Sequence, residues 1–195
     1  MENMFNLIFN LDISNSLKTK IYNYFEKYNN VFLKYFPKMS DVDIYFSHAQ
    51  KANPEISKNQ KVWGVAHLKD NFMEFVIFED DFSEADFVQN IFHELNHQFR
   101  AQIFPPENNI WNDVILEGLA LNFEKQASRE LNYSLKFLTD YYEKPDEEKL
   151  KWGLKRILEI FRNGESYNHY NWYYNHFGED PDLPTNFVYR VGEFL

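Results

Sequence analysis

Apolar residues recur every three or four positions in several long stretches of the chain, which is the spacing of a helix that buries one face. Between Phe87 and Phe99 they fall at every fourth position, and Pro105-Pro106 marks the end of that stretch because proline cannot continue a helix. The pattern predicts helices over residues 16–36, 84–104, 110–131 and 146–161, a short helix over 134–142, and a last helix that contains Tyr189 and is capped by Thr185.

Strand patterns lie between the first two predicted helices. Apolar and polar residues alternate, or short apolar runs occur, over residues 41–47, 62–68 and 73–78. The three residues 69–71 between the last two runs predict a hairpin, residues 50–60 are polar enough for a loop, and residues 167–177 are ambiguous. The resulting class is α+β, with a small antiparallel or mixed sheet followed by a mainly helical half.

The helix stripes also indicate which residues face the core. In the helix over 110–131 the expected apolar side is Trp111, Val114, Ile115, Leu119 and Phe123. In the helix over 146–161 it is Leu150, Leu154, Ile157, Leu158 and Phe161, with Asn163-Gly164 as the stop signal. In the helix over 84–104, Ile103 widens the stripe, Ser83 is suited to cap the helix, and Asp86 can complete a capping box.

The helix over 84–104 carries a chemical motif, because the residues from His93 to His97 read His-Glu-Leu-Asn-His. On a helix His93 and His97 lie about 40° and about 6 Å apart, with Glu94 on the flank of the same face. Zinc hydrolases use this arrangement, since they need two ligands on one helix face and a base beside the metal-bound water.

Glu117 in the next predicted helix is the candidate third ligand. A connection of about five residues favours antiparallel packing of the two helices. His97 lies about seven residues before the end of the first helix and Glu117 about seven after the start of the second, so each is about 10 Å from the turn. A helical hairpin would therefore bring Glu117 level with His97, and we expect His93, His97 and Glu117 to bind one zinc ion.

Two segments of this pattern resemble the gluzincin metallopeptidases, whose third ligand is a glutamate on a following helix. They are the His-Glu-x-x-His motif at His93 and the Glu-Gly-Leu-Ala segment from Glu117 to Ala120. A closer resemblance, over roughly residues 40–195, is to a bacterial family of predicted zinc-dependent proteases, which continues the first motif to Arg100. That family also has Tyr-x-x-Gly near its C-terminus, as at Tyr189. The resemblance implies a zincin-like pair of active-site helices.

The sequence supports a metallopeptidase hypothesis in which Glu94 is the general base. Glu94 would take a proton from the metal-activated water and return it to the leaving amine, while zinc polarises the carbonyl of a peptide or protein substrate. Two alternatives remain open. One is a non-catalytic protein that keeps the metal for structure or for binding a partner, and the other is a chance motif in a helical interaction domain.

Three further side chains are candidates to stabilise the oxyanion of the tetrahedral intermediate: Tyr189, His176 and His169. Tyr189 is the first candidate of the three, and the alternative for it is a core residue in a tyrosine-rich chain. Asp113 could orient a ligand imidazole, or it could be an acid favoured in the first turn of its helix. Glu124 could support the site from further out or lie on a solvated face.

Two other histidines, His48 and His67, are expected to be structural.

Composition limits the classes of protein that fit. The chain has 195 residues, 44% hydrophobic and 19% aromatic, which excludes a disordered chain and fits one domain with parts at 1–104 and 105–195. Cysteine is absent, so a disulfide framework is excluded. The net charge of −10 disfavours non-specific nucleic-acid binding. No signal peptide or membrane-spanning run is evident, so we expect a cytoplasmic protein. Cleavage specificity, endo- or exopeptidase action and oligomeric state remain open.

Overall fold

The computed structural model describes residues 5–49, 61–78, 82–105, 107, 109–133, 147–165 and 187–195. The chain divides into two compact units, Met1–Pro105 and Pro106–Leu195. Among the described residues, the first unit holds a sheet with helices, and the second holds helices alone. None of the described helices combines the length and the apolar composition that a membrane crossing requires.

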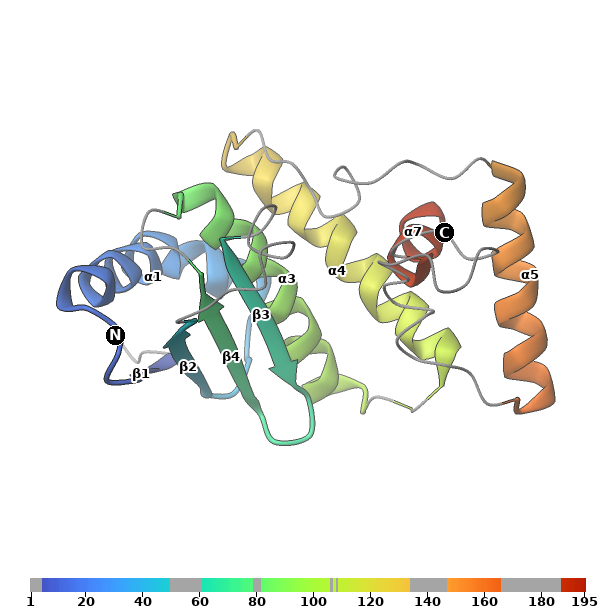
Figure 1. The fold of residues 1–195 in the computed structure, drawn as a ribbon, viewed down its shortest axis with the longest axis horizontal. Helices are drawn as coiled ribbons and strands as arrows, with labels where there is room; N and C mark the ends of the chain where they lie inside the picture. The colour runs from blue at the N-terminus through green and yellow to red at the C-terminus, as the bar shows by residue number, and fades with distance from the viewer. Residues whose placement is uncertain are drawn as a thin grey trace. The chain divides into compact units, whose positions relative to one another are not determined.

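A mixed four-stranded sheet is the base of the first unit (Figure 1). Its strands are β1 (Phe5–Phe9), β2 (Val42–His48), β3 (Val62–His67) and β4 (Phe72–Ile77), in the spatial order β1-β2-β4-β3. β2 is parallel to both of its neighbours, whereas β3 pairs antiparallel with β4 at the edge of the sheet. The α+β class and the β3–β4 hairpin are thereby confirmed, while β1 was missed by the sequence analysis.

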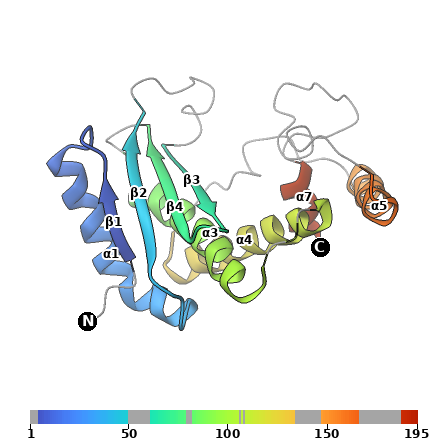
Figure 2. The same ribbon diagram turned by 90° about the horizontal axis from the view of Figure 1, so that it is seen from below.

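Helices α1 (Asn15–Tyr35) and α3 (Glu84–Ile103) both lie behind the sheet in Figure 2. Aromatic rings fill the space between these layers. The Phe25 ring of α1 contacts Phe5 of β1 at 5.3 Å, Phe46 of β2 at 6.3 Å and Phe87 of α3 at 5.3 Å between ring centroids. One side chain therefore joins two strands and both helices of this core.

Both ends of α3 are fixed by polar contacts. At its start, the Ser83 hydroxyl accepts from the Asp86 N–H at 3.1 Å and the Asp86 carboxylate accepts from the Ser83 N–H at 2.8 Å, so the predicted capping box is confirmed. Near its end, the side-chain amides of Gln98 and Gln102 donate to the side-chain oxygen Oδ1 of Asn71 at 2.8 and 2.6 Å. Asn71 lies in the β3–β4 turn, with a φ of 55° that asparagine tolerates. The helix is thus attached to the hairpin.

The second unit contains α4 (Ile110–Glu130), α5 (Glu147–Asn163) and α7 (Phe187–Phe194), with α7 between the other two (Figure 1). Its core is a cluster from all three helices: Ile110, Val114, Leu121, Ile157, Ile160, Val188, Tyr189 and Val191. α5 ends at the predicted stop, since Gly164 has a φ of 61° and the Glu165 N–H donates to the Ile160 carbonyl at 3.1 Å. The four long helices begin and end within two residues of their predicted bounds.

Part of the expected core was wrong. On α4, Ile115 and Leu119 are 39% and 36% exposed. Its buried positions are instead Ile110, Val114, Glu117, Gly118, Ala120, Leu121, Glu124, Ala127 and Ser128. Ile103 and Phe161 are 52% and 47% exposed, and Ile160 is buried beside Phe161. The periodicity located the helices correctly, but the side that packs depends on which neighbour lies against it.

Several predictions fall on residues that the structure does not describe. These are the loop at 50–60, the short helix at 134–142, the ambiguous stretch at 167–177 and the cap at Thr185.

Candidate metal centre

His93 and His97 lie one turn apart on α3, as the motif requires. Their Nε2 atoms are 3.1 Å apart, and their ring planes are inclined by 78° with centroids 4.8 Å apart. His97 is 7% exposed and His93 is half-buried. Two imidazole nitrogens at this separation could both serve as ligands of one metal ion. Because α3 is capped at its start and hydrogen-bonded to Asn71 near its end, the backbone that carries both rings is held in place.

Glu94 lies on the flank of the histidine pair, over strand β3. A Cβ atom built on Gly64 of β3 would be only 2.7 Å from Cγ of Glu94. The aliphatic part of Glu94 therefore rests directly on the strand, in the space that a side chain at position 64 would fill. Glu94 is half-buried there.

Glu117 lies on α4, and the backbone at its neighbour Gly118 is in close contact with α7. A Cβ atom at Gly118 would be 2.3 Å from the Gly192 carbonyl oxygen, and one at Gly192 would be 2.4 Å from the Val114 carbonyl oxygen. Only glycine allows these two backbones to meet so closely. The glycine of each motif, Gly118 in Glu-Gly-Leu-Ala and Gly192 in Tyr-x-x-Gly, thus has a packing reason. Glu117, which is 8% exposed, directly precedes this close contact on its helix.

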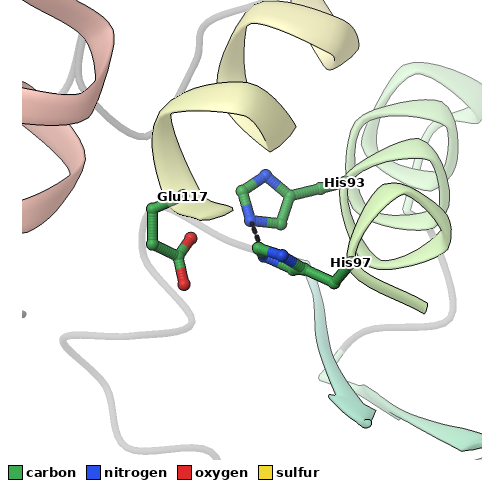
Figure 3. A group of neighbouring side chains, drawn as sticks. All are labelled: His93, His97 and Glu117. Atoms are coloured by element: carbon green, nitrogen blue, oxygen red, sulfur yellow. Dashed lines mark hydrogen bonds between the residues drawn. The ribbon is translucent and has the colours of Figure 1, made fainter. Parts of the chain in front are cut away.

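Figure 3 shows the three predicted ligands, His93, His97 and Glu117, as a group that could hold a metal ion. Their ligand atoms all lie within 4.8 Å of one another. In a tetrahedral zinc site with Zn–N distances of about 2.0–2.1 Å, two ligand nitrogens are about 3.3 Å apart. The observed 3.1 Å between the imidazoles fits this value. The donor set of two imidazoles and one carboxylate is also one that zinc accepts.

Comparison with known families gives a match over most of the chain. The family model described as "Predicted Zn-dependent protease (DUF2268)" matches residues 21–193. The chain belongs to this family. No curated protein and no solved structure matches it. The family description names zinc, and the three clustered side chains could hold a metal ion. Both findings support the assignment of the chain to a family of predicted zinc proteases.

The other residues that the sequence suggested for the site lie in different surroundings. Tyr189 lies on α7, is 8% exposed and belongs to the core of the second unit. Asp113 lies in the first turn of α4, where an acid is favourable for the helix dipole. Glu124 is 2% exposed, so the alternative of a solvated face is wrong. His169 and His176 lie outside the described residues.

The two histidines expected to be structural are not part of the cluster. His67 stacks on Phe72 with a centroid distance of 4.1 Å, and its Nε2 is 3.1 Å from a Glu74 carboxylate oxygen. His48 ends strand β2.

Sequence reasoning missed Gly64, although a signal was present. A glycine in the interior of a strand weakens it and often marks a close approach of another part of the chain. Gly64 lies between Trp63 and Val65 in just such a position.

Proposed function

We propose that this protein is a zinc-dependent peptidase of the gluzincin type, with one zinc ion held by His93, His97 and Glu117. The observation that supports the proposal most is the grouping of these three ligand atoms within 4.8 Å, beside a glutamate on the same helix face. Zinc, when bound, would lower the pKa of a water molecule and polarise the carbonyl of the scissile peptide bond.

Glu94 is the proposed general base. Its carboxylate accepts a proton from the attacking water, whose oxygen forms the new bond to the carbonyl carbon. The carbon–nitrogen bond then breaks, and Glu94 returns the proton to the leaving amine. A purely structural metal site would not need a carboxylate at this position, which favours catalysis over the alternative of a non-catalytic metal protein.

Tyr189 is proposed as the donor that stabilises the oxyanion. The proposal rests on the Tyr-x-x-Gly resemblance, and the burial of Tyr189 at 8% exposure also suits a core residue. Tyr189→Phe separates the two roles because it keeps the ring and removes only the hydroxyl. A loss of about tenfold or more in kcat with unchanged stability supports the catalytic role. Equal activity assigns Tyr189 to the core.

The first experiment measures the metal content of the purified protein by elemental analysis. We expect about one zinc per chain, retained in His67→Ala and lost in His97→Ala. His67→Ala is the matched control, since it also removes a histidine from the first unit but lies outside the cluster. No bound metal after zinc is offered and the excess removed would make the motif a coincidence in a helical interaction domain.

The second experiment measures hydrolysis of a peptide library by the zinc-loaded protein. Glu94→Gln should keep the metal and lower kcat by about 10²–10⁴-fold, the range for loss of a general base. Glu74→Gln on the exposed side of β4 is the control for the same chemical change. Bound zinc without hydrolysis of any peptide would favour the non-catalytic alternative, and full activity in Glu94→Gln would refute the proposed base.

A further inference from the structure

Gly64 has no room for a side chain. A Cβ atom there would lie 2.5 Å from Cε1 and 3.1 Å from Cδ1 of Phe75, and 2.7 Å from Cγ of Glu94. Distances below 3.0 Å are essentially never seen for real Cβ atoms, so even alanine would force a neighbour to move. Phe75 is directly paired with Gly64 across the β3–β4 ladder and is fully buried.

A glycine in this strand is unfavourable on its own account. Glycine loses more backbone freedom on folding than any other residue, and it contributes no side chain to the sheet. The two residues before it in β3, Val62 and Trp63, and the one after it, Val65, are types that suit a strand. The requirement for glycine must therefore come from what lies over it, namely the Phe75 ring and the stem of Glu94.

These two contacts have different consequences. The Phe75 ring belongs to the core, and a clash with it would affect only stability. The Glu94 stem belongs to the flank of the histidine pair, and a clash with it would turn the carboxylate to another rotamer. Because Cγ is the atom in contact, the side-chain torsion that would change first is χ1, which moves the carboxylate farthest.

We propose that Gly64 is a positioning residue for Glu94. The bare backbone of β3 forms the surface on which the Glu94 stem rests, and this surface fixes the direction of the carboxylate. The catalytic meaning of that position rests on the proposed function, whereas the contact itself does not. In this view Gly64 touches neither the metal nor the substrate and acts only through Glu94.

The contact can be tested without any activity, by a double-mutant cycle on the unfolding equilibrium of the metal-free protein. Gly64→Ala should increase the unfolding constant of the first unit by roughly tenfold or more. In a Glu94→Ala background, where Cγ is absent, the same substitution should have an effect about fivefold smaller. An equal effect in both backgrounds would overturn the proposal, because Glu94 would then not be the group that Gly64 accommodates.

Gly64→Ala could prevent folding through the Phe75 clash alone, so the cycle is repeated in Phe75→Leu. Leucine has no Cε atom, so it removes the contact at 2.5 Å and leaves the Glu94 contact as the only one of the three below 3.0 Å. The coupling between positions 64 and 94 should persist in that background. Its disappearance would assign Gly64 to the core and overturn the positioning role.

The consequence for catalysis is measured on the zinc-loaded protein with the same peptide library. Gly64→Ala with Phe75→Leu should bind as much zinc as Phe75→Leu alone, with a similar KM and a kcat lower by about tenfold or more, because small displacements of a catalytic group cost rate rather than binding. An unchanged kcat would refute the positioning role even if the contact exists. If wild type hydrolyses nothing, the proposed function fails, and the stability cycle still decides whether Gly64 positions Glu94.

Discussion

The crossing of α4 and α7 provides a quantitative prediction for Gly192→Ala. The added methyl group would lie 2.4 Å from the Val114 carbonyl oxygen and 2.7 Å from the Cα and N atoms of Gly118. All three are backbone atoms of α4, so no side chain can turn aside to make room. An ordinary contact begins near 3.4 Å, and α7 must therefore move away by about 1 Å.

The energetic cost follows from that displacement. A gap of about 0.5–1 Å removes roughly a quarter to a half of the dispersion energy of each contact that it opens. Overpacking in a well-packed core costs about 1–3 kcal/mol, and the rigid backbone contact places Gly192→Ala near the upper value. Alanine recovers about 1 kcal/mol through its better helix propensity. The net loss of stability is about 2 kcal/mol, which corresponds to a roughly 30-fold increase in the equilibrium constant for opening of the second unit.

Hydrogen exchange followed by mass spectrometry is the suitable assay. The chain has two compact units, so a single melting temperature would mix their contributions. Peptides from α4 and α7 should exchange roughly 30-fold faster in Gly192→Ala, whereas peptides from the sheet of the first unit serve as the internal reference. Protection of α7 equal to wild type or better would refute the reasoning.

A second variant tests whether one contact is responsible. Gly118→Ala adds a methyl group to the same crossing, 2.3 Å from the Gly192 carbonyl oxygen. Once the helices have moved apart for one methyl group, the second should cost less, so the double variant should lose less stability than the two single losses together. Strict additivity would mean that the two glycines act at separate places.

Three further outcomes are expected. Ser83→Ala should destabilise the first unit by about 1 kcal/mol in denaturant titration, because it removes the capping box of α3; an unchanged midpoint would contradict this. Zinc at about 100 times its dissociation constant should stabilise wild type by about 2.7 kcal/mol, measured as slower hydrogen exchange in α3, and His97→Ala should show no such gain. Hydrogen bonds from Asn163 and then Arg156 lower the pKa of Glu165, so Asn163→Ala should raise that pKa in an NMR titration. The associated stability is present above the ordinary glutamate pKa and is lost as the pH falls through the lowered one.

Local signals in the sequence determined the helices, one hairpin and the chemistry of the motif. Caps, proline stops and the apolar period act over a few residues, so the bounds of α3 and α4 could be found without knowledge of the rest of the fold. The spacing from His93 to His97 fixes two donors on one helix face for the same reason, because the geometry of one turn does not depend on tertiary structure.

Contacts between distant segments were decided only by the tertiary structure. β1 is five residues long, and its partner strand β2 follows in the sequence only after the whole of α1. No local pattern therefore shows the place of β1 in the sheet. The buried side of α4 could not be predicted from the sequence either. Close contact of Gly118 with Gly192 of α7 buries small residues on that side of the helix, while Leu119 stays exposed. The approach of Glu94 to Gly64 joins a helix to a strand some thirty positions earlier. The sequence determined which groups are available, and the packing of elements far apart in the chain decided what each of them touches.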